Sequence, residues 1–323
     1  MNGRFGAAGP ALARILRLLE KEGGEVDQLV REGRFQRALA LIAGISSLLS
    51  GFEAAEEHYR AGYGLQVMYT PVLVSPLLLI AGVWSFFSRR AARVFLPIVS
   101  VLTIVDGLVG LYFHVRNIAR RPGGWRLPVV NAVMGPPLFA PVLFTISGYL
   151  GLIASLLRRS DEPGDVPEVP AWLPRVPGGF ADDLESIEHE VREGRFQQQL
   201  ALAAGLAALF SGIESWYSHY KNAFDHRVEW TPLAITPLVV VAGLGAARSS
   251  LVAKTLLPLA SLLAIVDGTL GFYFHVRGML RRPGGIRLGI YNLLYGPPPF
   301  APLLFAASGF MGVLASLLRR SRP

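Results

Sequence analysis

The hydrophobic pattern of this chain consists of long apolar stretches separated by short polar ones. Eight stretches stand out, at about 36–57, 70–88, 94–115, 136–157, 197–218, 231–248, 255–276 and 297–318. At about 1.5 Å per residue, a helix of roughly 20 residues crosses a hydrocarbon core of about 30 Å. The pattern therefore predicts an all-α integral membrane protein with eight transmembrane helices.

The two halves of the chain resemble one another closely. Residues 31–160 align with residues 192–321 without a gap, and about half of the aligned positions are identical. This similarity predicts a tandem duplication of a four-helix unit. Because four is an even number of spans, both copies should enter the membrane in the same direction. We expect them to be related by a pseudo-two-fold axis along the membrane normal.

The predicted domain boundaries follow from this duplication. They are an N-terminal amphipathic segment (1–35), a first four-helix repeat (36–160), a linker (161–180), an amphipathic segment (181–196) and a second repeat (197–323). The linker is rich in proline, which favours an extended chain. The amphipathic segments are expected to lie along the membrane surface or under the bundle.

Proline and glycine mark the ends of several predicted spans. Thr70-Pro71 and Thr231-Pro232 are typical of a helix N-cap followed by a first-turn proline. Gly135-Pro136-Pro137 and Gly296-Pro297-Pro298 break the chain just before the fourth span of each repeat. These motifs are expected to shape the entry of each helix.

Composition supports the membrane interpretation and excludes several cofactors. Only 17% of the residues are charged, against about a quarter in a typical soluble domain. The chain has no cysteine, which excludes Fe–S clusters, cysteine-ligated zinc and c-type haem. The net charge is +8, but the basic residues cluster at the ends of apolar stretches. That distribution indicates topology and lipid headgroups, not nucleic acid.

The distribution of arginine and lysine also predicts the orientation of the chain. The segments on the same side of the membrane as the N-terminus carry more arginine and lysine than the segments on the other side. The positive-inside rule then favours cytoplasmic N- and C-termini. The expected location is the bacterial inner membrane.

Ionisable residues recur inside the apolar stretches. The sequence IVDGLVGLYFHVR at 104–116 returns as IVDGTLGFYFHVR at 265–277. The first and third spans of each repeat should run parallel, so their C-terminal ends meet at one membrane face. The residues brought together there are Glu53, His58, Tyr59, Asp106, His114 and Arg116 in the first repeat, and Glu214, His219, Tyr220, Asp267, His275 and Arg277 in the second. Ionisable groups at membrane depth are costly and indicate function by default.

The depth of these groups divides them into two layers. His58 and His114 should share an outer level, while Glu53 and Asp106 lie deeper along their helices. One ion cannot readily take all four as ligands. We therefore expect the two histidines to ligate a transition metal, with Glu53 completing the shell and Asp106 orienting a ligand. The second repeat offers the same set.

A b-type haem is an equally open interpretation of the same site. The haem would lie between the two histidines of a repeat, with Arg116 or Arg277 near its propionates and Tyr59 or Tyr220 beside it. The sequence thus predicts a metal- or haem-binding membrane subunit of a redox assembly that carries electrons. The arginine-rich loops 116–126 and 277–287 would contact other subunits or lipid headgroups.

Two other functions are compatible with the same residues. The polar groups could form a structural network that only fixes helix packing, as in an assembly subunit. They could also line a path for protons or small solutes. The sequence carries no serine nucleophile elbow, phosphate-binding glycine loop or HExxH motif, and enzymatic activity stays an open question.

Overall fold

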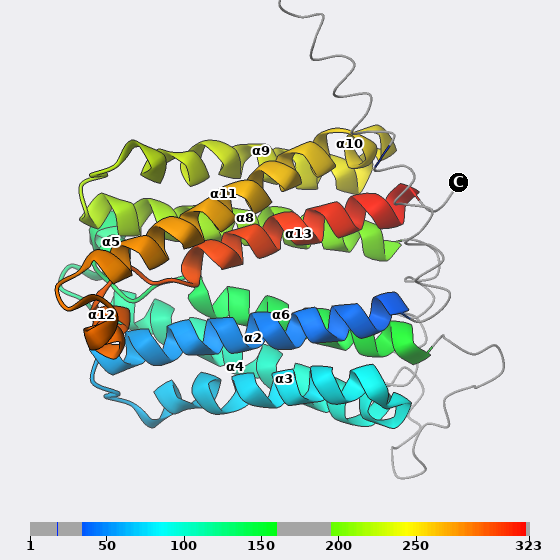
Figure 1. Ribbon diagram of the computed structural model, residues 1–323, viewed down its shortest axis with the longest axis horizontal. Helices are drawn as coiled ribbons and strands as arrows, with labels where there is room; N and C mark the ends of the chain where they lie inside the picture. The colour runs from blue at the N-terminus through cyan, green and yellow to red at the C-terminus, as the bar shows by residue number, and fades with distance from the viewer. Residues whose placement is uncertain (1–17, 19–33, 160–194, 321–323) are drawn as a thin grey trace, which may run out of the picture.

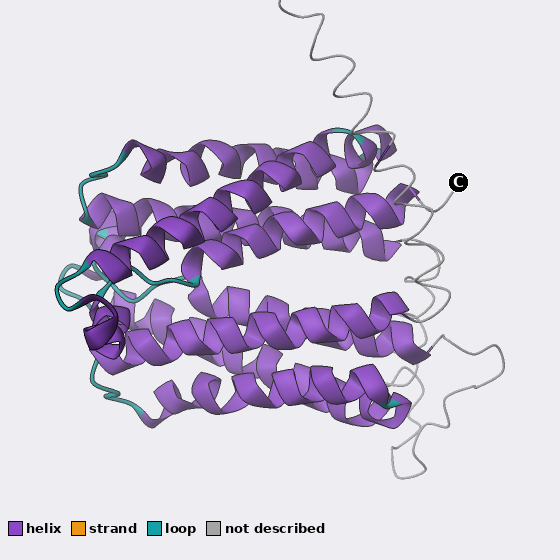
Figure 2. Ribbon diagram, viewed as in Figure 1, coloured by secondary structure: helices purple, strands orange, loops and turns teal. Residues whose placement is uncertain are grey.

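The computed structural model describes residue 18 and residues 34–159 and 195–320. All regular structure in these ranges is helical, and loops and turns connect the helices (Figure 2). The predicted linker at 161–180 lies outside the described residues. So do the two amphipathic segments, apart from Leu18 and the first residues of two helices.

The first half contains four long helices and several short ones. The long helices are α2 (Arg34–Arg60), α3 (Thr70–Phe87), α4 (Leu96–Ala119) and α6 (Ala140–Arg159). The short elements are η1 (Gln66–Tyr69), the π-helical turn η2 (Ala91–Phe95), η3 (Gly124–Arg126) and α5 (Pro128–Val133).

The second half has the same order of elements. Its long helices are α8 (Arg195–Lys221), α9 (Thr231–Arg248), α11 (Leu256–Arg281) and α13 (Ala301–Arg320). The short elements are η4 (Arg227–Trp230), α10 (Ser250–Lys254), η5 (Gly285–Leu288) and α12 (Gly289–Tyr295). The halves differ before the third long helix, where the π-helical turn η2 in the first half corresponds to α10 in the second.

The long helices form two bundles that lie side by side (Figure 1). In the first bundle, α2 packs on α3 and α6, and α4 packs on α6. In the second, α8 packs on α9 and α13, and α11 packs on α13. The bundles meet through contacts of α6 with α8 and of α2 with α13. A continuous core of leucine, alanine and other apolar residues runs through both bundles.

Small residues allow the helix pairs to approach closely. A Cβ atom at Gly82 in α3 would lie 2.3 Å from the carbonyl oxygen of Ala40 in α2. The equivalent contact joins Gly243 in α9 to Ala201 in α8, at 2.6 Å. Close backbone approach through small residues is typical of helix packing in membranes.

Six described helical segments are long and apolar enough to cross a membrane: Gln36–Arg60, Gln66–Phe87, Ala91–Ala119, Gln197–Lys221, Arg227–Arg248 and Leu256–Arg281. Large apolar side chains cover their outer surfaces, including Phe87 at 79% exposure and Val241 at 60%. Contiguous apolar surface of this kind suits contact with lipid. The chain is therefore an all-α protein whose helices indicate an integral membrane protein.

The fourth helix of each half begins later than its apolar stretch predicts. The predicted spans start at residues 136 and 297, whereas α6 starts at Ala140 and α13 at Ala301. The reason is local: consecutive prolines after a glycine supply no backbone N–H to a helical ladder and restrict the residue before them. The apolar parts of these helices, Ala140–Leu156 and Ala301–Leu317, are correspondingly short.

The segments that precede the fourth helices cross between the bundles. Helix α5 of the first half contacts α8 of the second, and α12 of the second half lies beside the end of α2 (Figure 1). Each half therefore sends one loop and one short helix over the other half. This exchange determines the surroundings of the predicted polar residues.

Candidate functional site

A pair of histidines occupies the same end of each bundle. His58 lies near the end of α2 and His114 near the end of α4, and their ring centroids are 6.5 Å apart with an interplanar angle of 73°. In the second half, the rings of His219 and His275 are 6.2 Å apart at 81°. The expectation that the histidines of the first and third spans meet at one level is confirmed.

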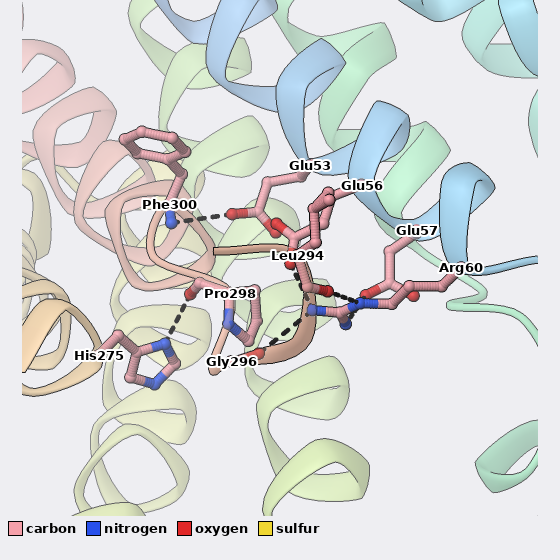
Figure 3. Close-up of polar contacts among 9 residues, drawn as sticks. All are labelled: Glu53, Glu56, Glu57, Arg60, His275, Leu294, Gly296, Pro298 and Phe300. Carbon is pink, nitrogen blue, oxygen red and sulfur yellow. Dashed lines mark hydrogen bonds and ion pairs between the residues drawn. The ribbon is translucent and has the colours of Figure 1, made fainter. Parts of the chain in front are cut away.

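Backbone carbonyl groups hold three of these four imidazole rings. The Nδ1 atoms of His58, His114 and His275 lie 2.7 Å, 2.5 Å and 2.6 Å from carbonyl oxygens. The carbonyls belong to Met68, Pro137 and Pro298, respectively. A carbonyl only accepts, so each Nδ1 donates a proton, and the neutral ring keeps its lone pair on Nε2. Figure 3 shows the second nitrogen of His275 on the side of the ring away from Pro298.

The fourth histidine has a different neighbour. The Nδ1 atom of His219 lies 3.5 Å from a carboxylate oxygen of Glu229, which stands where the first half has Met68. Aromatic pairs flank the two sites as well: Tyr63 stacks on Tyr69 beside His58, and Phe224 stacks on Trp230 beside His219. Burial, together with neighbouring Tyr69, raises the pKa of Tyr63 above its usual value. The two sites are thus similar but not identical.

Each half-buried aspartate is hydrogen-bonded to a threonine. The hydroxyl of Thr70 contacts Asp106 and also lies 2.8 Å from the carbonyl oxygen of Val67. Thr231 makes the same two contacts, with Asp267 and Val228. A hydroxyl has one proton, so each threonine either shares that proton between the carbonyl and the carboxylate oxygen or donates it to the carbonyl and accepts from a protonated aspartic acid.

These threonines do not cap their helices, contrary to the prediction from Thr70-Pro71 and Thr231-Pro232. Helices α3 and α9 include the threonine as a helical residue, and the preceding residues, Tyr69 and Trp230, make no capping hydrogen bond through their side chains. The tertiary contact with an aspartate on the neighbouring long helix uses the hydroxyl instead.

The two glutamates reach across to the opposite half. Glu53 Oε1 accepts a hydrogen bond from the backbone N–H of Phe300, 2.8 Å away, and Glu214 Oε1 accepts one from Phe139, at 2.7 Å. Their carboxylates also accept from the N–H groups of Ala301 and Ala140, the first residues of α13 and α6. The carboxylates of Glu53 and Glu214 therefore cap the N-termini of α13 and α6, where backbone N–H groups lack partners within the helix.

The predicted metal shell of two histidines with a glutamate is not assembled. Within residues 34–159 and 195–320, no group of three histidine or carboxylate side chains is arranged to hold a metal ion. Each histidine pair offers two nitrogen ligands only. Glu53 and Glu214, expected to complete the shells, are bound to backbone N–H groups of the other half instead.

The residues predicted to surround a haem are spread over the surface. Tyr59 and Tyr220 are exposed, at 50% and 59%, as is Arg277, while Arg116 is half-buried. No hydrogen bond in the described part of the chain ties these four residues to the histidines.

Sequence reasoning missed the carbonyl groups that hold the histidines and the role of Arg60. Arg60 donates to the carbonyl oxygens of Leu294 and Gly296 in the second half and forms ion pairs with Glu56 and Glu57 (Figure 3). The spacing of these glutamates from Arg60, three and four residues, is a recognised signal for helical ion pairs. The carbonyl contacts have no sequence signal, since any residue supplies a carbonyl.

Asparagines attach the short helices α5 and α12 to the arginine-rich loops before them. Asn131 donates to the carbonyl oxygens of Pro122 and Gly124, and Asn292 makes the equivalent bonds to Pro283 and Gly285. The chain matches no protein-family model, and no curated protein or solved structure is significantly similar to it.

Proposed function

We propose that this protein is a membrane-embedded, metal- or haem-binding subunit of an electron-transfer assembly, with one two-histidine centre in each half. One observation carries the proposal. Paired imidazoles whose Nδ1 atoms are held by backbone carbonyls present their Nε2 lone pairs, and this is how metal-ligating histidines are usually oriented.

The spacing of the rings fits shared ligation of one metal. With metal–nitrogen distances of about 2.0–2.1 Å, two imidazoles on opposite sides of an ion would have centroids roughly 6.4 Å apart. The measured centroid distances are 6.5 Å for the first pair and 6.2 Å for the second. The centroid spacing of each pair is therefore compatible with two imidazoles that bind one ion.

The number of ligands narrows the choice of occupant. Two imidazoles leave the remaining coordination positions to another component, and a porphyrin supplies four nitrogens to a b-type haem iron. A bare ion such as copper is also suited to imidazole ligands. His58 with His114, and His219 with His275, would hold the iron or copper, and the metal would supply one-electron chemistry when bound.

The proposed architecture has eight transmembrane helices. Helices α6 and α13 would add two spans to the six long apolar segments. The two halves would be copies of one four-helix unit, related by a pseudo-two-fold axis along the membrane normal. The matching order of elements supports this. We also propose cytoplasmic termini in a bacterial inner membrane, which places both histidine pairs near the outer face.

The arginine-rich loops 116–126 and 277–287 are the proposed contact with other subunits or with anionic headgroups. Arg126 and Arg287 are exposed there, and Trp125 and Ile286 beside them are exposed at 55% and 82%. Aromatic and apolar side chains mixed with arginine are typical of a membrane–water interface.

An absorption spectrum with elemental analysis of the protein purified in detergent tests the function. We expect a Soret band, or iron or copper at about two per chain, and loss of the signal in the double variant His114→Ala, His275→Ala. His226→Ala is the matched control, because this histidine is exposed. The proposal is wrong if the purified protein contains neither haem nor metal and takes up neither haemin nor Co²⁺.

The structure also favours a second candidate, a structural subunit whose polar residues fix helix packing. Asp106, Asp267, Glu53 and Glu214 all have partners within the protein. Under this alternative, His114→Ala with His275→Ala lowers the melting temperature and changes no bound species. The same preparations therefore separate the two candidates.

A further inference from the structure

We infer that one histidine of each pair is positioned by the opposite half of the chain: Glu53 and Arg60 act on His275 of the second half, and Glu214 acts on His114 of the first. The inference rests on the proposed function for its ligand, but the contacts that carry it are geometric. These contacts are more numerous at the second site than at the first.

The segment Leu294–Phe300 connects the two halves at the second site. At one end, Arg60 donates to the carbonyls of Leu294 and Gly296. At the other end, Glu53 accepts from the N–H of Phe300, while the ring of Phe52 packs on the ring of Phe300 at 5.1 Å. Both ends of the segment are therefore attached to α2 of the first half.

The same segment holds the ligand. The carbonyl of Pro298, between the two attachment points, accepts from Nδ1 of His275 at 2.6 Å (Figure 3). The position of this carbonyl determines which nitrogen of His275 carries the proton and how the ring is oriented. Glu53 and Arg60 are thus positioning residues for a histidine on the other half.

The first site has only part of this arrangement. Glu214 accepts from Phe139, the ring of Phe210 stacks on Phe139 at 4.5 Å, and Pro137 holds His114. At the position of Arg60, however, the second half has Lys221, which lies 5.0 Å over the ring of Tyr217. Glu56 and Glu57 are replaced by Tyr217 and Ser218. The second site is therefore held more firmly than the first.

The test uses full-length protein in which one site at a time is removed. The variant His58→Ala, His114→Ala keeps the second site, and the variant His219→Ala, His275→Ala keeps the first. In each background, Co²⁺ affinity is measured by titration with Glu53→Ala, Glu53→Gln or Glu214→Ala added. Loss of a residue that orients a metal-ligating histidine typically weakens binding about 10–100-fold.

The expected pattern is crossed. Glu53→Ala should weaken Co²⁺ binding about 10–100-fold at the second site and leave the first within a few-fold, and Glu214→Ala should do the reverse. Glu53→Gln keeps a carbonyl oxygen that can accept from Phe300 and should restore binding. Arg60→Lys should weaken only the second site. An effect confined to the residue's own half, or equal at both sites, would overturn the inference.

A second measurement does not depend on metal binding. In protein labelled with ¹⁵N-histidine, His275 should show the tautomer protonated on Nδ1, and Glu53→Ala should abolish that preference while Asp106→Ala leaves it. An unchanged His275 tautomer in Glu53→Ala overturns the inference even if the protein binds metal. If the tautomer responds but wild-type protein binds no Co²⁺, the proposed function fails and the cross-half positioning stands.

Discussion

Glu53 and Phe300 are 247 positions apart in the chain, yet the glutamate carboxylate accepts a hydrogen bond from the phenylalanine backbone N–H at 2.8 Å. The contact joins a side chain of one half to the N-terminus of the fourth helix of the other. Glu214 and Phe139 form its counterpart. Both predicted centres therefore depend on how the halves are assembled, and the stability of that assembly can be tested by substitution.

Removal of the glutamate acceptor should destabilise the protein. Glu53→Ala leaves the N–H of Phe300 without its partner in a half-buried position, which typically costs about 1–3 kcal/mol. Glu53→Gln should recover most of this loss because its amide oxygen can accept the same bond. Thermal unfolding in detergent measures both. Equal melting temperatures for Glu53→Ala and wild type would show that the contact contributes nothing to stability.

Substitution of Asp106 tests whether a neutral side chain that hydrogen-bonds Thr70 is sufficient for stability. Asn can donate to the Thr70 oxygen while that hydroxyl donates to Val67, so Asp106→Asn should retain near wild-type stability. Asp106→Ala removes one of the two partners of the threonine and should cost about 0.5–1.5 kcal/mol of unfolding free energy. If Asn were as harmful as Ala in thermal unfolding, a charged carboxylate would be required at this position.

Gly82→Ala should destabilise the protein, because the added methyl group does not fit between α3 and α2. An added Cβ would lie 2.3 Å from the Ala40 carbonyl, so α3 would have to move away from α2. Overpacking of this kind typically costs about 1–3 kcal/mol. Gly64→Ala is the control, since no atom lies within 4 Å of a Cβ at that position. The prediction fails if the two variants have the same melting temperature.

Single cysteines can report the orientation of the chain, which has none of its own. Trp125→Cys and Ile286→Cys should react with a membrane-impermeant maleimide from the periplasmic side, because both residues are exposed in the arginine-rich loops. Leu251→Cys, exposed at the opposite end of the second bundle, should react only after the membrane is opened. The reverse pattern would place the termini outside.

Much of the fold could be predicted from the sequence because lipid imposes a simple rule. A chain that crosses a bilayer must satisfy its backbone hydrogen bonds within helices, so long apolar stretches mark those helices directly. The start of α3 at Thr70 agrees with its predicted stretch, and the pairing of His58 with His114 follows from counting spans. The late start of α6 also has a local cause, the prolines before it.

The contacts of the polar residues could not be predicted, because they depend on how distant parts of the chain pack together. Spacing along a helix gives the depth of Glu53 but not its partner, because the partner is a backbone N–H on a loop that crosses from the other half. The same holds for the Pro137 and Pro298 carbonyls, since a backbone carbonyl is present in every residue and leaves no mark in the sequence. The apolar pattern alone identifies which polar residues interrupt the long helices. The exchange of loops between the bundles decided which of them lie together.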